Sequence, residues 1–508
     1  MIEKYLYDNR KQESAKINVL MAFPGIYSFG MSALGFQNVF KMIDTIEGVY
    51  AERYFTDTKT TVVHSEDVDV IGVSMSFEMD FLSVFKILEK FNVPFKSEDR
   101  DDNTPLIYGG GPVLSSNPEP YAEFFDFISL GDGCNAVQPI FEFIRDNRDL
   151  NRKELLKQLD EKFDFVYVPS LKSDKTEKVN NKVKLCDCLA TTILSEDSFF
   201  KNTYIVEVER GCPKKCKFCQ TSYINHPVRF IDYEKIIKSL EFGLKYTNKI
   251  ALLGAAICAH PKIDDICDYI MSRIDCGEEI EMSVSSLRAD CISPKTVQTL
   301  VKCGQRSATI AVEAGSERLR QYINKDLTNE DVFRAIDTIV ENGMNSIKVY
   351  MMIGLPSETK EDIKAIVSLG KEIKSRHKAL DLTFSFSSFI PKAHTPFEAE
   401  AYEGIRSLEK KFGYLQKELT KVGVKVRPSS PKWDFWQSVL SVGGRELCDY
   451  LIEVYKNGGN LGAFKSVYMQ YVKDGKFEDE GNLSEKKVCV KSEKPWKFIK
   501  VNNLIVQK

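Results

Sequence analysis

The central part of the chain alternates short apolar runs with longer stretches in which apolar residues recur at helical spacing. Each apolar run has strand length, and each is followed by a stretch long enough for a helix. This alternation predicts a parallel sheet with right-handed crossovers, curved like a barrel. The expected strands are Thr203–Val208, Lys249–Gly254, Glu281–Ser285, Ala308–Val312, Ser346–Met352 and Leu382–Ser388. The expected helices are Tyr233–Tyr246, Ile263–Ile274, Pro294–Lys302, Glu330–Glu341, Glu361–Lys374 and Gly404–Thr420.

A similar alternation before this region predicts a separate Rossmann-like α/β domain with its own parallel sheet. Glycines cluster just after two of its strands, at Gly109–Gly111 and at Gly131 and Gly133. Open parallel sheets bind ligands at that edge, so we expect a binding site there. The expected strands are Ile17–Ala22, Arg53–Thr56, Val70–Ser74, Pro105–Gly109 and Asp126–Leu130, with helices at Met31–Asp44, Asp80–Phe91 and Ala136–Arg145.

These patterns divide the chain into four expected parts. Residues 1–145 form the N-terminal α/β domain, and residues 146–200 form a charged linker with a short hairpin. Residues 201–424 form a partial (β/α)6 barrel, since the two further units of an eight-unit barrel are not found. Residues 425–508 form a small C-terminal cap of helices and extended segments.

Composition indicates an ordinary globular protein, with 43% hydrophobic and 28% charged residues among 508. A formal net charge of −3 gives no electrostatic footprint for nucleic acid or a membrane. The N-terminus lacks a signal-peptide pattern, and the longest apolar stretch, Ile250 to Ala259, is too short to span a bilayer. Thirteen cysteines without an export signal favour a reducing cytoplasm.

Three of these cysteines stand together directly after the first barrel strand, as Cys212, Cys216 and Cys219. Thiolates at this spacing can hold three irons of a 4Fe–4S cluster and leave the fourth iron open for chemistry. The loop also carries Lys214 and neighbouring basic residues, and this positive charge offsets an anionic cluster. The alternative is a structural zinc site. Zinc would need a fourth ligand, and the nearby candidates are Cys186, Cys188 and His226.

The spacing Cys-x-x-x-Cys-x-x-Cys, with Phe218 before the last cysteine, resembles the cluster loop of radical S-adenosylmethionine (SAM) enzymes. The resemblance implies a 4Fe–4S cluster that binds SAM at the open iron, cleaves it reductively and thereby functionalises an unactivated C–H bond. It also implies SAM contacts at later strand ends. After the second strand the family has a Gly-Gly-Glu-like segment that binds the methionine amine, but here the acid is missing from Gly254-Ala255-Ala256. The implied SAM-binding residues are Phe218, Gly254, Ala255, Ser285, Arg288, Glu313, Ser316 and Ile353.

The N-terminal domain is similar to that of radical SAM proteins with a cobalamin-binding domain, on the segments Phe23–Ser32, Tyr108–Gly111 and Gly131–Gly133. Members with known roles are often C-methylases or ring-forming enzymes. Many such domains place a cobalt-ligating histidine after the first strand, but the segment from Phe23 to Gly30 has none. Either cobalamin binds without a protein ligand below cobalt, or the domain serves docking or substrate binding. The implied cobalamin contacts are Tyr27, Gly30, Ser74, Gly109, Gly110, Gly131 and Gly133.

The hypothesis is therefore a radical SAM enzyme, with cobalamin-dependent C-methylation as its sharpest form and an electron donor such as flavodoxin or ferredoxin as partner. Methylthiolation of RNA or protein is a second hypothesis, but its enzymes carry another three-cysteine cluster, and residues 1–185 contain only Cys134. A third is a non-catalytic, metal-stabilised protein that binds RNA through the lysine-rich tail from Lys486 to Lys500. The substrate and the catalytic residues stay open, and the candidate acid/base groups at the barrel mouth are Glu78, Tyr350, Lys392 and His394.

Overall fold

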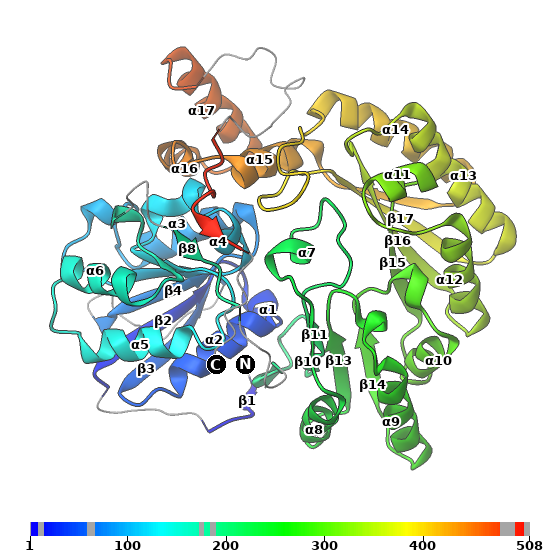
Figure 1. Cartoon of the computed structure of the whole chain (residues 1–508), viewed down its shortest axis with the longest axis horizontal. Coiled ribbons are helices and arrows are strands. Elements are labelled where there is room, and N and C mark those ends of the chain that lie inside the picture. Colours follow the sequence, from blue (N-terminus) through cyan, green and yellow to red (C-terminus); the bar gives the residue numbers. More distant parts are fainter. Residues whose placement is uncertain are drawn as a thin grey trace.

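The computed structural model describes residues 2–8, 15–57, 67–171, 177–182, 189–477 and 493–501. Figure 1 shows a parallel sheet with its helices on the left, a second region of strands with outer helices on the right, and C-terminal helices above the two. Within the described ranges, no helix is long and apolar enough to cross a membrane.

The N-terminal sheet has six strands in the order β3-β2-β4-β5-β6-β7. Neighbouring strands from β3 to β6 run parallel, and only β7 pairs antiparallel with β6. The strands expected from the sequence are present, but β3 begins at Val49 rather than at Arg53, because Val49 and Ala51 already alternate inward. The strands are β2 (Ile17–Phe23), β3 (Val49–Phe55), β4 (Val70–Ser74), β5 (Leu106–Gly110), β6 (Phe127–Ser129) and β7 (Val166–Tyr167).

Helices cover both faces of this sheet, and each buries an apolar stripe against it. Phe36, Phe40 and Phe141 belong to the core cluster on one face. Phe81 and Phe85 pack into the larger cluster on the other face. The helices are α2 (Leu34–Asp44), α3 (Phe81–Lys90), α5 (Val137–Asp146) and α6 (Arg152–Lys162).

The parallel part of the barrel contains all of the strands that the sequence predicts, together with one more from the segment expected as the C-terminal cap. They form a three-stranded sheet, β10-β13-β14, and a four-stranded sheet, β15-β16-β17-β18, with parallel pairing throughout. The added strand, β18, extends the sheet beyond β17. The strands are β10 (Tyr204–Glu207), β13 (Lys249–Leu253), β14 (Glu281–Val284), β15 (Ser307–Glu313), β16 (Ser346–Ile353), β17 (Asp381–Ser388) and β18 (Lys425–Pro428).

The two barrel sheets meet between β14 and β15 through one isolated bridge, Leu287 to Ile310, rather than through a continuous ladder. The Val284 N–H donates to the side-chain oxygen of Gln305 at 3.1 Å. That backbone donor is satisfied without a strand partner, so the ladder can open here at little cost.

Helices on the outer side of these strands follow the expected order. Thr328 and Thr359 each cap a helix through a reciprocal bond with an aspartate three residues on, which confirms the helix start expected before Glu330. The helices are α8 (Tyr233–Leu244), α9 (Ile263–Asp275), α10 (Pro294–Lys302), α11 (Glu317–Tyr322), α12 (Asn329–Glu341), α13 (Lys360–Arg376) and α14 (Ile405–Lys421).

The segment expected as a linker is built into the fold. Helix α6 and strand β7 pack on the N-terminal sheet, with Leu159 and Val166 fully buried. Strand β8 (Lys178–Val179) pairs with β19 (Ile499–Lys500) near the C-terminus, and β9 (Ile193–Ser195) pairs with β1 (Glu3–Tyr5). Within the described residues of this segment, β8 and β9 thus pair with strands near the two ends of the chain and not with each other as a hairpin.

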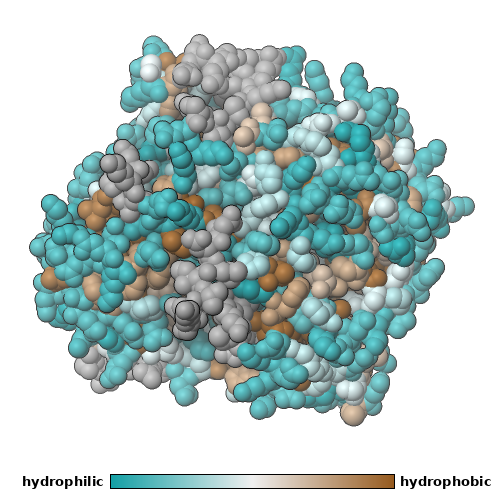
Figure 2. All heavy atoms as spheres, viewed as in Figure 1, coloured by the Kyte–Doolittle hydropathy of each residue, from teal (hydrophilic) through white to brown (hydrophobic). Residues whose placement is uncertain are grey.

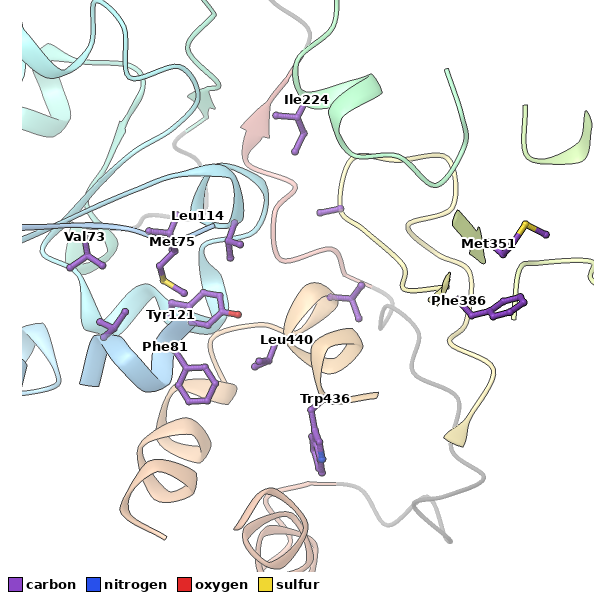
Figure 3. Close-up of a cluster of buried hydrophobic side chains, with 14 of the residues drawn as sticks. Val73, Met75, Phe81, Leu114, Tyr121, Ile224, Met351, Phe386, Trp436 and Leu440 are labelled. Carbon is purple, nitrogen blue, oxygen red and sulfur yellow. The ribbon is translucent and has the colours of Figure 1, made fainter. Parts of the chain in front are cut away.

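The C-terminal helices join the two halves of the molecule. They are α15 (Pro431–Val442), α16 (Leu447–Lys456) and α17 (Leu461–Lys473). Figure 3 shows Trp436 and Leu440 of α15 between Phe81 and Tyr121 of the N-terminal part and Phe386 of the barrel, all in one buried cluster. On the face in Figure 2 the surface is mainly hydrophilic, with apolar side chains showing over the N-terminal part and near the middle.

Candidate active site

The three-cysteine loop follows the first barrel strand and is closed by a short hairpin. Strand β11 (Glu209–Arg210) pairs antiparallel with β12 (Arg229–Phe230), so both ends of the loop return to one place. Gly211 lies between β11 and Cys212 with φ +88°, and a Cβ there would lie 2.5 Å from the Asn225 carbonyl oxygen. Glycine is therefore required at the loop entrance. This position, at the C-terminal end of β10, is where barrel folds place reactive groups.

The thiols of the loop are shielded from water. Cys212 and Cys216 are buried and Cys219 is half-buried. The loop backbone is held to the segment after α11, since the Lys217 N–H donates to the Ile323 carbonyl at 3.0 Å and the Asn324 amide donates to Lys215 O at 2.8 Å. Burial raises the pKa of Cys212 and raises that of Cys216 to about 11, against the opposing charge of Lys325. Burial therefore favours the protonated form of Cys212 and Cys216 in the absence of metal, and iron binding has to displace their protons.

A mononuclear zinc site is not formed by the described residues. Among them, no three histidine, cysteine or acidic side chains, the three loop cysteines included, lie together in a way that would hold a metal ion. His226 lies on the exposed side of the loop, and Cys186 and Cys188 lie outside the described residues. Three thiols on one loop match a cluster that spreads its ligands over three irons and needs no fourth.

Two ion-pair groups face the cysteine loop from later strand ends. Asp290 binds Arg288 at 2.9 Å and also Lys214 of the loop at 3.0 Å. Burial opposes ionisation of Asp290, but these two cations hold its pKa at about 2. Lys325 lies 3.3 Å from Glu313, a residue at φ +69° at the end of β15. The site thus combines buried thiols with fixed positive charge.

The residues implied as SAM contacts occupy different environments. Arg288 and Glu313 are held in these ion pairs, while Ala255 and Ser285 are exposed and Gly254 is half-buried. Ser316 caps α11 and hydrogen-bonds Asp362. Ile353 is fully buried in the barrel core, and Phe218 packs on a small apolar cluster that contains Ala314, Leu355, Phe389 and Phe397.

Glu209 is a site residue that the sequence did not single out. It is 2% exposed, although it lies between the first strand and the cysteines. One of its carboxylate oxygens accepts the N–H of Ala256, and a Cβ on Gly254 would lie 2.5 Å from its Cγ. Its other oxygen, Oε2, makes no hydrogen bond, and the backbone of Ala255 lies near enough to the carboxylate to oppose part of the effect of burial on its pKa. Burial raises the pKa of Glu209 to about 7. No pattern in the sequence indicates this, because an acidic residue beside a strand end is ordinarily exposed and the partner of Glu209, Ala256, comes from another element.

A cavity of about 390 Å³ lies where the N-terminal sheet edge meets the first barrel strand and the end of the cysteine loop. Of the residues implied as cobalamin contacts, Ser74, Gly110, Gly131 and Gly133 line it. The other three do not. Tyr27 is buried with its hydroxyl bonded to Glu3 and Ser195, Gly30 packs against Phe55 and Phe23, and Gly109 packs against Leu114 and Phe125.

Asp132 joins the two halves at the wall of this cavity. Its carboxylate pairs with Arg210 at 3.1 Å and with Arg229 at 2.5 Å. Arg210 also binds Glu207 in a two-bond pair at 2.6 and 2.8 Å, and its guanidinium lies 3.7 Å from the Cys134 sulfur. Both arginines come from the hairpin that closes the cysteine loop, so the N-terminal sheet holds that hairpin in place.

Three of the four candidate acid/base groups make contacts between the N-terminal domain and the rest of the chain. Lys392 forms an ion pair with buried Glu78, whose second oxygen accepts from Gln437 at 2.8 Å. The His394 ring nitrogen Nε2 lies 2.9 Å from the Ser116 carbonyl. Tyr350 is 41% exposed and is the least constrained of the four.

Two family models match the chain. One is described as the N-terminal part of radical SAM proteins and matches residues 35–169, and the other is the radical SAM superfamily, matching residues 206–370. An uncharacterized protein of Methanocaldococcus jannaschii is 29% identical over 472 residues, 91% of this chain and 97% of its own.

Solved structures show the same fold. The radical SAM methyltransferase TsrM from Kitasatospora setae, with cobalamin and a 4Fe–4S cluster bound, matches with a TM-score of 0.50 and 12% identity over 76% of this chain and 77% of its own. The cobalamin-dependent SAM radical enzyme OxsB, with aqua-cobalamin and SAM bound, matches with a TM-score of 0.53 and 15% identity over 91% and 71%.

Proposed function

This chain belongs to the radical SAM superfamily, and from that premise we propose that Cys212, Cys216 and Cys219 ligate a 4Fe–4S cluster that cleaves SAM reductively. The observation that carries the proposal is the set of three shielded thiols at the C-terminal end of β10, held by a hairpin and by the segment after α11. When bound, such a cluster supplies an electron and an open iron for the amine and carboxylate of SAM.

The protein's part is to charge, shield and orient this site. Lys214, Arg288 and Lys325 place positive charge around the thiols and favour their ionised, iron-bound form. Phe218 and the apolar residues beside it keep water from one side of the loop. Asp290 balances two of these cations, which leaves Arg288 fixed in position rather than free to move.

The finer part of the proposal is that the enzyme functionalises an unactivated C–H bond, by C-methylation with cobalamin bound at the cavity between the halves. The support is the cavity's place beside the cysteine loop and its glycine-lined edge at Gly110, Gly131 and Gly133, where backbone can approach a large ligand. No histidine is among the lining residues of this cavity, so those residues give cobalt no imidazole ligand. A low-potential donor such as flavodoxin or ferredoxin would supply the electron.

The test is anaerobic purification with iron, sulfide and cobalamin supplied, followed by iron analysis, a visible spectrum and product assay with reductant. The expected wild-type protein is brown and releases 5′-deoxyadenosine, or S-adenosylhomocysteine if it methylates. Cys216→Ala should lose the cluster, whereas Cys276→Ala, at an exposed cysteine outside the site, should keep it. A colourless wild-type protein that retains zinc would overturn the proposal, and a cluster protein that never retains cobalamin would overturn its finer part only.

A further inference from the structure

The Glu209 carboxylate is a buried acid with half of its hydrogen-bonding capacity unused. It is 2% exposed, and its Oε2 atom has no partner. A buried, unpaired carboxylate oxygen costs free energy unless some group fills the place. Two half-buried acids of the site region are paired with cations: Asp290 with Arg288 and Lys214, and Glu313 with Lys325.

The Glu209 carboxylate packs against the loop that follows the second barrel strand, β13. Its first oxygen accepts from the Ala256 N–H, and Gly254 is in contact with its side chain. A methyl group on Gly254 would lie 2.5 Å from Glu209 Cγ, so the glycine leaves the room in which the acid lies. Gly254-Ala255-Ala256 is also the segment in which this chain lacks an acidic residue.

We infer that Glu209 supplies, from the strand before the cysteine loop, the acceptor for the amino group of SAM that the segment after β13 cannot supply. The N–H bonds of that amino group would be donated to Oε2, while Oε1 stays anchored on the backbone of Ala256. Glu209 then acts as a binding residue that orients SAM on the cluster. This inference rests on the proposed function, because it needs a cluster with an open iron.

The alternative is a purely structural role, in which Glu209 only holds the loop after β13 through Ala256. Both roles predict that replacement affects the site, so stability alone cannot separate them. The two roles differ in which ligands lose affinity when the carboxylate is replaced. A structural role weakens every adenosyl ligand equally, whereas an amine-binding role weakens only ligands that carry the amine.

The experiment therefore measures anaerobic equilibrium binding to cluster-loaded protein for two ligands, SAM and its analogue with hydrogen in place of the α-amino group. Wild type is compared with Glu209→Gln, which keeps shape and removes the negative charge. The matched control is Glu119→Gln, a carboxylate equally buried at 2% exposed, which binds Tyr167 and Arg445 far from the loop. Iron content and thermal melting are recorded for all three proteins.

The expected result is that Glu209→Gln binds SAM about ten- to a hundredfold more weakly, the range for a hydrogen bond to a charged group. Its affinity for the analogue should change little, and its iron content should match wild type. Glu119→Gln should bind both ligands like wild type. Equal losses for SAM and analogue, or no loss for either, would overturn the inference. Wild-type protein that forms no 4Fe–4S cluster would instead overturn the proposed function, so the two failures are distinguishable.

Discussion

Asp132, after strand β6 of the N-terminal sheet, forms an ion pair at 3.1 Å with Arg210 of the barrel. Arg210 lies two residues before Cys212, the first cysteine of the candidate cluster loop. The pair is largely shielded, with side chains 8% and 12% exposed. Through it, the loop that ends β6 restrains the hairpin that closes the cysteine loop. The N-terminal part is thereby coupled mechanically to the site where SAM chemistry is proposed.

Asp132→Asn is expected to weaken this coupling and the whole fold. It removes the shared partner of Arg210 and Arg229 and leaves buried positive charge less compensated, which costs on the order of 3 kcal/mol. Anaerobic urea unfolding would measure the change. Asp449→Asn is the control, because its pair with Lys96 is 65% exposed on the acid side and should contribute under about 1 kcal/mol. Equal small losses for both variants would contradict the structural role of Asp132.

Gly211→Ala is expected to abolish cluster binding. The added methyl group would meet the Asn225 carbonyl at 2.5 Å, and the loop entrance would have to move. Gly304→Ala is a matched control, since Gly304 also has a positive φ, at +92°, but has open space around its Cβ position. The control should lose only about 1–2 kcal/mol of stability from backbone strain and keep its iron. Full iron content in Gly211→Ala after reconstitution would show that the loop does not need this geometry.

Acid should destabilise the protein partly through His394. Burial lowers its pKa to about 4, although the Ser116 carbonyl and Glu398 favour the charged form, against Lys182 and Lys494. A histidine has an ordinary pKa near 6.5, so the unfolded chain binds the proton first as pH falls. This contribution to stability is therefore present above about pH 6.5 and is lost as pH falls toward 4.

His394→Gln removes this proton-linked component. Wild type minus variant should show an unfolding free-energy difference that decreases as pH is lowered from 7 to 4, by up to about 3 kcal/mol. Denaturant unfolding at a series of pH values would measure it. A difference independent of pH would mean that His394 is not held neutral by its surroundings.

The regular part of the fold could be predicted from sequence because periodicity reports burial. Strands such as β16 and β17, with alternating or continuous burial, stand out, as do helices that begin at Thr328 or Thr359 with an aspartate three residues on. Strand β18 could not be predicted, because in Lys425–Pro428 no residue is buried and only its pairing with β17 makes it a strand. The gap between β14 and β15 depends on Gln305, a side chain whose partner no local pattern reveals.

The candidate site divides in the same way. The cysteine loop is local in sequence, so its spacing alone predicts a cluster site. Three other site residues could not be predicted in this way, because each is defined by a partner on another element. The pairs are Glu209 with Ala256, Lys325 with Glu313 and Asp132 with Arg210. The candidate cobalamin residues are implied by the resemblance of short segments to cobalamin-binding domains, yet Tyr27, Gly30 and Gly109 pack away from the cavity because other side chains surround them.

The most direct test of the central claim is the Mössbauer spectrum of iron-57 reconstituted protein, recorded with and without SAM. If Cys212, Cys216 and Cys219 leave one iron of the cluster open, SAM should shift the signal of a single iron while the other three keep theirs. The Cys276→Ala variant should behave in the same way. A spectrum that SAM does not change, or a protein that binds one zinc in place of the cluster, would contradict the account.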